Sequence, residues 1–309
     1  MKKAPKRSAR PASGTPEGVS LNVRRPSFDF GALPRYWCGG NPWKTHFGTA
    51  LMLVFPSGER FVVQGVRRYR KAITDPKLAE EVDRFCAQEG FHSREHGKLN
   101  RLLFARGFAG LARFEKLQSD TLKLMGRIFP ERFQLALSAS IEHLTSSFGH
   151  QALSQREELE AMHPVARELL IWHAIEEMEH KSVAFDVHRA LGGGQAARVA
   201  GLALVVPMVL VVTYAIFLYL LAADRRLFDG KMWKAELVDA QLANLRRIRA
   251  GERAIGLFTA LPRDVAAFLR PSFHPWDLDD RALIADAASY DPIAELARRG
   301  VANATPATV

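Results

Sequence analysis

Two segments that carry glutamate and histidine at helical spacing constrain this chain more than any other feature of its sequence. In chain order they supply Glu89, His92 and His96, and then His173, Glu177 and His180. Each set runs at steps of three and four, so its side chains project from one stripe of a helix. The steps are three and then four in the first set, and four and then three in the second. A carboxylate and two imidazoles on one stripe suit a metal ion better than an apolar core, but one such helix cannot close a site.

The rest of the chain predicts an all-α fold in which these two segments are joined by further helices. Proline marks several boundaries, because it favours the first helical position and interrupts a helix interior. We expect helices over 45–55 and 59–72 with a kink or restart at Pro56, and then over 76–105, 107–129, 130–156, 164–191 and 199–223. Residues 230–309 predict amphipathic helices with proline breaks, of which 254–269 would cover the bundle or lie on a membrane surface.

Spacing along the chain identifies two further acids that can join the site. Glu59 lies 15 residues before the turn at Thr74, and Glu89 lies 13 residues after Pro76. At 1.5 Å per residue, an antiparallel hairpin places both acids roughly 20 Å from the turn. Glu142 and Glu177 are level in a second hairpin by the same argument. The 53 residues between Glu89 and Glu142 leave room for a long crossover.

The result is one Glu, one Glu-x-x-His, a second Glu and a second Glu-x-x-His on four successive helices. This order is the ligand pattern of ferritin-like four-helix bundles with a di-iron or di-manganese carboxylate site. The six predicted ligands are Glu59, Glu89, His92, Glu142, Glu177 and His180. Glu142 is the only acid between Phe133 and Leu144, so it must be paired, protonated or bound to metal. Glu59 could instead be a first-turn glutamate favoured by the helix dipole.

Two histidines remain on the stripes, and we predict different roles for them. His173 is expected to be a seventh ligand, and His96 to orient a ligand from behind. Glu176, Glu179 and Asp186 lie off the stripe and are expected to be solvated or to support ligands, with Asp186 accepting from a ligating imidazole. Mixed oxygen and nitrogen donors favour two iron ions, with manganese or zinc as alternatives.

Three stretches around these ligands resemble a bacterial family of predicted metal-dependent hydrolases. The stretches are Phe55-Pro56-x-Gly58-Glu59, Gln88-Glu89-x-x-His92-x-x-x-His96 and Glu176-Glu177-x-Glu179-His180-Lys181-x-Val183-Ala184-Phe185-Asp186. The resemblance covers about residues 22–270 and implies metal dependence more firmly than a reaction. The run His173-x-x-x-Glu177-x-x-His180 is also similar to the ligand run of di-iron arylamine N-oxygenases, which have an extra histidine. His96 departs from that second pattern.

These features leave three functional hypotheses. The favoured one is oxygen-dependent oxidation of an apolar or amine substrate at a di-iron site, with an external electron donor. The alternatives are hydrolysis of an ester or phosphate by a metal-bound hydroxide, and metal binding without catalysis. No nucleophile elbow, phosphate loop or dinucleotide fingerprint is present in the sequence.

Residues 199–223 form an uncharged run long enough to span a bilayer. We therefore predict a membrane-embedded helix within 195–226 and membrane lipid as a partner. The expected location is a bacterial inner membrane, with the metal site on the cytoplasmic side. The metal-binding helices would occupy 28–194, and a C-terminal helical region 227–309.

Residues 1–25 hold seven Lys and Arg against one Glu, and a basic, disordered tail is predicted over 1–27. No nucleic-acid recognition motif follows this tail, so its charge better fits anionic lipid. Two cysteines, Cys38 and Cys86, exclude a disulfide framework and indicate a reducing compartment. The sequence leaves a homodimer open.

Overall fold

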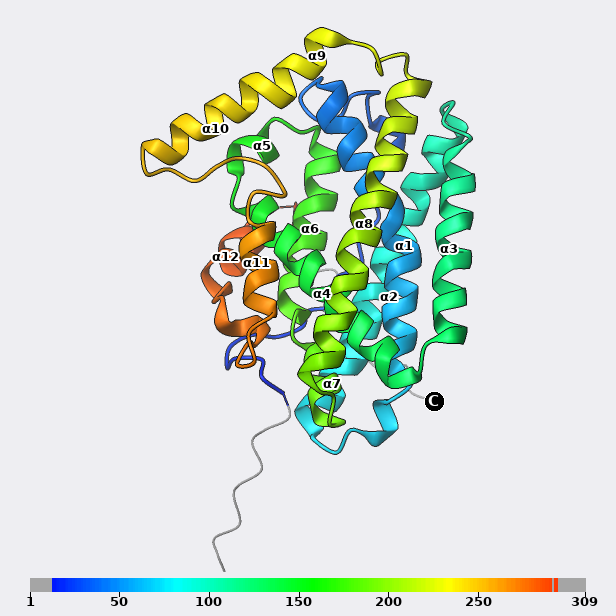
Figure 1. The fold of residues 1–309 in the computed structure, drawn as a ribbon, viewed down its shortest axis with the longest axis vertical. Coiled ribbons are helices and arrows are strands. Elements are labelled where there is room, and N and C mark those ends of the chain that lie inside the picture. Colours follow the sequence, from blue (N-terminus) through cyan, green and yellow to red (C-terminus); the bar gives the residue numbers. More distant parts are fainter. Residues whose placement is uncertain (1–12, 291, 294–309) are drawn as a thin grey trace, which may run out of the picture.

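The computed structural model describes residues 13–290 and 292–293, and this part of the chain is helical with no strand (Figure 1). The prediction of an all-α fold is confirmed. The longer helices are α1 (Pro42–Arg67), α2 (Pro76–Ala105), α3 (Leu111–Ile128), α4 (Glu131–Leu153), α6 (Pro164–His180), α8 (Gln195–Ala223) and α10 (Ala240–Arg249). The shorter ones are α5 (Arg156–Glu160), α7 (Val183–Ala190), α9 (Gly230–Lys234), α11 (Leu261–Phe268) and α12 (Arg281–Ala288).

Side-chain caps and prolines set the starts of the helices that matter for the site. Asn41 caps α1 by accepting from the backbone N–H of Lys44 at 3.0 Å, and Pro42 follows it. Asp75 caps α2 in the same way, with Pro76 at the first helical position. Pro56 lies inside α1 without ending it, so the expected restart at this proline is wrong. The helix is continuous from Pro42 to Arg67.

The helix predicted over 164–191 is interrupted where the second metal-binding segment ends. α6 stops at His180 and α7 begins at Val183. The buried ammonium of Lys181, at the break, donates to the carbonyl oxygen of Leu278 at 2.7 Å and to Asp280 at 2.6 Å. These partners come from the C-terminal region, so a long-range contact, absent from the local sequence pattern, fixes the break.

Four helices, α1, α2, α4 and α6, form a closed ring of contacts, and we call them the donor helices. α1 packs against α2 and α4, and α6 packs against the same two helices. Large side chains such as Phe85, Leu135 and Trp172 are almost fully buried among them. Each such side chain contributes roughly 1.5–3 kcal/mol by leaving water. The assignment of this ring to the ferritin-like bundles stays a prediction.

The long apolar helix α8 lies beside the donor helices and packs against α1 and α4 (Figure 1). By length and composition it could cross a membrane, with a mean hydropathy of 2.6 over an 18-residue window that is 33% buried. The core helix of a soluble protein can meet the same criteria.

Residues 13–27, expected to belong to a disordered tail, instead run extended along the donor helices. The side chains of Thr15, Leu21 and Arg24 are buried. Backbone N–H groups of the segment donate to acids on other helices, as Gly14 does to Asp186 at 2.7 Å. The segment is polar in composition and buries little apolar surface. Hydrogen bonds from its backbone to buried carboxylates hold it against the helices instead. Residues 1–12 lie outside the described part of the chain.

Candidate metal centre

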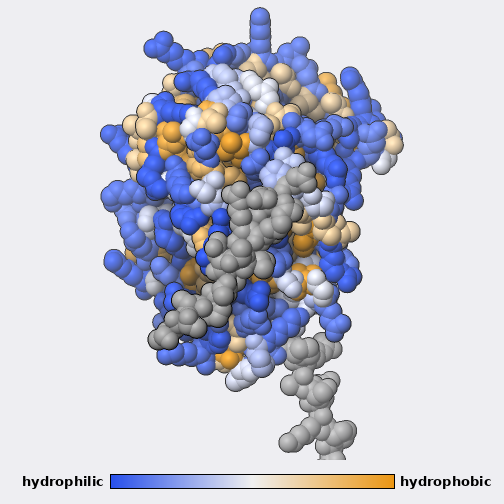
Figure 2. Space-filling model, turned by 180° about the vertical axis from the view of Figure 1, so that it is seen from behind, coloured by the Kyte–Doolittle hydropathy of each residue, from blue (hydrophilic) through white to orange (hydrophobic). Residues whose placement is uncertain are grey.

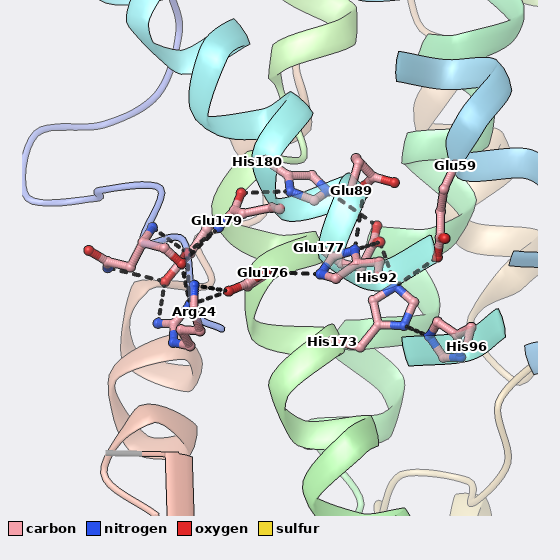
Figure 3. Close-up of polar contacts among 12 residues, drawn as sticks. Arg24, Glu59, Glu89, His92, His96, His173, Glu176, Glu177, Glu179 and His180 are labelled. Atoms are coloured by element: carbon pink, nitrogen blue, oxygen red, sulfur yellow. Dashed lines mark hydrogen bonds and ion pairs between the residues drawn. The ribbon is translucent and has the colours of Figure 1, made fainter. Parts of the chain in front are cut away.

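The eight predicted site residues meet in one buried cluster between the donor helices. Figure 3 labels all of them except Glu142. α1 supplies Glu59, α4 supplies Glu142, and the two mirrored segments lie on α2 and α6. The donor atoms form four overlapping sets, and the atoms within each set all lie within 4.8 Å of one another. The sets are Glu89, Glu142, Glu177 and His180; Glu59, Glu89 and His92; His92, His173 and Glu177; and Glu59, His96 and His173.

The first of these sets has the hairpin geometry that the chain spacing predicts. The Nε2 atom of His180 lies 3.1 Å from Glu89, 3.2 Å from Glu142 and 3.5 Å from Glu177. On the other side of the cluster, the Nδ1 atom of His92 lies 3.6 Å from Glu89 and 3.5 Å from Glu177. Glu89 and Glu177 therefore lie between the two imidazoles, within 3.1–3.6 Å of a nitrogen of each.

The two further histidines form a pair at the edge of the cluster. The Nε2 atom of His173 lies 2.7 Å from Glu177 and 4.0 Å from Glu59, so this nitrogen points into the site. Its Nδ1 atom lies 2.6 Å from Nε2 of His96. Through this contact His96 holds the ring of His173. His96 also belongs, with Glu59 and His173, to one candidate donor set.

Buried polar atoms without hydrogen-bond partners indicate that the cluster fits cations. Both carboxylate oxygens of Glu59 and of Glu89 are buried without a hydrogen bond, as are Oε2 of Glu142 and Oε2 of Glu177, although Nε2 of His180 lies 3.1–3.5 Å from three of these acids. The site-facing nitrogens Nδ1 of His92 and Nε2 of His180 are in the same state. Leaving such groups without a partner costs about 1–3 kcal/mol each, and more when they are charged. Oxygen and imidazole donors of this kind suit iron, manganese or zinc.

The protonation of the cluster without metal supports the same interpretation. Burial and the neighbouring Glu89 raise the pKa of Glu142 to about 8, and burial raises that of Glu59 well above its usual value. Burial opposes ionisation of Glu177, but its contacts with imidazoles hold its pKa well below normal. Burial opposes protonation of His180, yet the surrounding carboxylates raise its pKa well above normal. Protons therefore compensate the crowded acids where metal ions can do so instead.

Both metal-facing imidazoles are held from behind, one by Glu176, for which support of a ligand was one of the two expected roles, and one by Gln88, for which no role was predicted. His92 contacts Glu176 through its Nε2 atom at 3.0 Å, and His180 contacts the side-chain oxygen of Gln88 through Nδ1 at 3.0 Å. These contacts leave Nδ1 of His92 and Nε2 of His180 facing the site. Partners of this kind fix the tautomer and the ring orientation of a metal-binding histidine.

A single arginine connects the two supports. Arg24 contacts Glu176 at 3.3 Å and Glu179 at 2.7 Å, and all three side chains are buried. Gln88 donates to Glu179 at 2.9 Å. Arg24 therefore reaches His92 through Glu176 alone, and it reaches His180 through Glu179 and Gln88. Figure 3 shows this group on the opposite side of the imidazoles from Glu59 and His96. Glu176 and Glu179 are therefore not solvated.

The expected contact between Asp186 and a ligating imidazole is not present, and Cys86 lies outside the cluster. Asp186 does not contact a site imidazole; it lies 3.1 Å from His274 and accepts from the backbone of Gly14. Cys86 is half-buried and belongs to no candidate donor set among the residues that the structure describes. Burial raises the pKa of its thiol to about 11, so the side chain is an unreactive thiol at neutral pH.

Two cavities reach the cluster from different directions. A cavity of about 290 Å³ lies among α1, α3, α4 and α8 and ends at Glu59, Glu89, Glu142 and Glu177. Its other lining side chains are almost all apolar, including Leu117, Met208 and Val211. A second cavity of about 830 Å³ lies under α10 and reaches His173 and Glu177. Both are lined by Leu51, Phe55, Thr145, Phe148 and Glu177.

Comparison with known proteins gives one match. The family described as "predicted metal-dependent hydrolase" matches residues 22–279, which include every residue of the cluster and the arginine behind it. No curated protein and no solved structure matches the chain.

Proposed function

The chain belongs to the family of predicted metal-dependent hydrolases, and from this premise we propose that it hydrolyses an ester with an apolar chain at a dinuclear metal centre. The observation that carries the proposal is the buried cluster of carboxylate and imidazole atoms that lack hydrogen-bond partners. Six residues would hold two metal ions, with His173 as a seventh donor and His96 behind it. The six are Glu59, Glu89, His92, Glu142, Glu177 and His180.

When bound at this place, two metal ions supply Lewis-acid activation of a carbonyl and a water made more acidic. The residues of the chain position those ions and exclude bulk solvent. Glu89 and Glu177 lie between His92 and His180, and these four residues would hold both ions. Glu59 and Glu142, each near one end of the pair, can supply the remaining carboxylate ligands.

The two cavities support an apolar ester as the substrate. The smaller cavity offers apolar side chains up to the carboxylates, which suits an acyl or alkyl chain. The larger cavity adds polar side chains, among them Lys44, Glu158 and Arg247, which suit a polar leaving group or headgroup. A substrate that extends through both would place its ester bond near Glu177, which lines each of them.

The test is hydrolysis of p-nitrophenyl esters of increasing chain length by protein loaded with manganese, zinc or iron. We expect activity without oxygen, loss on chelation, and a preference for longer acyl chains. Glu177→Gln should reduce kcat/KM more than roughly 100-fold, since changes in the supporting shell of a metal site already cost about 10–100-fold. Glu81→Gln is a matched control, because Glu81 is a buried acid of α2 outside the cluster. Equal rates for chelated and metal-loaded protein would contradict the proposal.

A second candidate is oxygen-dependent oxidation of an apolar or amine substrate, which the sequence favoured. One observation favours it: the order Glu, Glu-x-x-His, Glu, Glu-x-x-His on four helices is typical of di-iron carboxylate proteins. The family description supports hydrolysis better. Substrate-dependent oxygen uptake by iron-loaded protein, given an external electron donor, with no ester hydrolysis under nitrogen, would select the oxidative reaction.

A further inference from the structure

Helix α10 and the turns before it have their polarity reversed relative to an ordinary surface helix. Glu236, Asn244 and Arg247 line the larger cavity, together with Leu237, Ala240, Gln241 and Ala243. The large apolar side chains that are exposed and do not line this cavity are Val238, Leu242, Leu245 and Ile248. Leu242 is 46% exposed, Leu245 50% and Ile248 56%. A surface helix normally buries its apolar stripe, so this one presents apolar side chains to whatever lies outside.

Polar contacts hold the helix in this orientation. Asn244 exchanges two hydrogen bonds of 2.8 Å with the backbone of Ile255, and Glu236 accepts from the side chain of Asn41 at 2.7 Å. Rotating the helix to bury its leucines would break these bonds. The apolar face is therefore fixed outward by the fold.

The charges around this face indicate what covers it. Residues 230–253 contain six basic side chains against three acidic ones. Five of the basic side chains are exposed, Lys231, Lys234, Arg246, Arg249 and Arg253, and the sixth, Arg247, lines the larger cavity. An exposed apolar stripe flanked by Lys and Arg is typical of helices that lie in the interface of an anionic bilayer.

Two other segments also expose large apolar side chains. Phe228, in the connection from α8 to α9, is 94% exposed. Of the side chains that α8 exposes, Leu204, Val211 and Leu218 are large and apolar, and its outer stripe carries no charge from Val199 to Ala223. The surface of the molecule seen from behind is mostly hydrophilic, with several apolar patches (Figure 2).

We propose that the outward face of α10, together with Phe228, docks on the surface of an anionic lipid bilayer. The occupant is the interfacial region of the bilayer, into which the leucines and Ile248 insert while the basic side chains contact phosphate groups. The cavity of about 830 Å³ that lies under α10 opens beneath this face and reaches His173 and Glu177. Docking would thus place one entrance of the candidate metal centre at the membrane. The proposal does not rest on the reaction proposed above.

Flotation with lipid vesicles tests the docking surface in the full-length protein. We expect wild type to float with phosphatidylcholine vesicles that contain phosphatidylglycerol, and less with pure phosphatidylcholine. Leu242→Glu with Leu245→Glu should lower the partition coefficient more than roughly tenfold, because burial of two leucines is lost. Arg246→Gln with Arg249→Gln should lower it roughly fivefold per charge on anionic vesicles.

Leu124→Glu with Ile128→Glu is the matched control. These residues are 53% and 60% exposed on α3, toward the end of the molecule away from α10 (Figure 1). The control should float like wild type, and circular dichroism should give all variants the same helix content. The proposal would be overturned if the wild type floated with neither kind of vesicle, or if the α10 variants floated like the control. It would also be overturned if the wild type were a dimer and the α10 variants monomers, since a second copy of the chain would then cover the face.

Discussion

At the scale of single residues, orientation of the imidazoles separates this cluster from a chance gathering of polar side chains. His92 and His180 each turn one nitrogen into the site and give the other to a buried partner. Glu176 holds the first ring directly, and Gln88 holds the second. Arg24 joins the two supports through Glu176 and Glu179. A guanidinium suits this position because it can contact two carboxylates at once.

Arg24→Ala should therefore weaken metal binding without removing a ligand. Loss of the arginine leaves two buried carboxylates uncompensated, which lets Glu176 move and frees the ring of His92. We expect the dissociation constant for manganese or zinc to rise by roughly 10–100-fold. Isothermal titration calorimetry of the metal-free protein measures it.

Arg25→Ala provides the control, because the adjacent side chain is exposed and contacts no acid of the supporting group. Arg24→Lys should restore only part of the affinity, since an ammonium cannot reproduce the two-sided contact. Equal affinities for the alanine variants at 24 and 25 would show that the arginine does not position the site.

How far the sequence predicted these residues follows from chain distance and periodicity. The eight clustered side chains share helix stripes, so steps of three and four and the hairpin lengths were enough to bring them together. Arg24 is 152 positions from Glu176 and lies in a segment without helical periodicity. Nothing in the local pattern connects the two. Gln88 and Glu176 each directly precede a predicted ligand, and that adjacency was an available signal.

At the scale of helices, the donor cluster requires close approach of α4 and α6. Gly149 of α4 faces the backbone of Ala174 in α6, one residue after His173. A Cβ atom at position 149 would lie 3.1 Å from the carbonyl oxygen of Ala174 and 3.3 Å from its Cα atom. Both neighbours are backbone atoms of a packed helix, so they cannot turn aside as a flexible side chain would.

Gly149→Leu should consequently destabilise the protein by roughly 1–3 kcal/mol, the usual range for an overpacked core. Gly126→Leu serves for comparison: that glycine also lies inside a helix, α3, and its Cβ would meet only the side chain of Gln134 at 4.0 Å. We expect it to change stability by less than about 1 kcal/mol. Urea denaturation followed by circular dichroism measures both. A similar loss for the two variants would mean that α4 and α6 can separate freely.

Helix boundaries were predictable where local chemistry fixes them and not where distant contacts do. Asp75 with Pro76 set the start of α2, and this start was expected from the sequence. The break after His180 was not expected, because it depends on the pairing of Lys181 with Asp280. The outward orientation of the leucines of α10 could likewise not be predicted from the sequence. Periodicity identifies an amphipathic helix but does not say which face the rest of the molecule covers.

At the scale of the whole molecule, the site gathers acids from all four donor helices at one buried place. α1, α2, α4 and α6 each place at least one acid in it, and these acids repel one another when ionised. Protons on Glu142 and on His180 relieve this repulsion in the metal-free protein. Bound cations would relieve it more completely, because each can contact several carboxylates at once. Metal binding should therefore be a property of the folded molecule and add to its stability.

Removal of metal should lower the melting temperature of the wild-type protein. A ligand that binds only the folded state stabilises it by about 2.7 kcal/mol when present at 100 times its dissociation constant. For a domain of this size, each kilocalorie shifts the melting temperature by about 2–4 °C. We expect dialysis against chelator to lower it by several degrees, and stoichiometric manganese or zinc, about two ions per chain, to restore it. Glu142→Gln with Glu177→Gln should melt at one temperature with or without metal, because the ions lose two shared ligands and the remaining acids repel less. A wild-type melting temperature that ignores both chelator and added metal would leave the cluster as a proton-compensated core and would remove the basis for catalysis there.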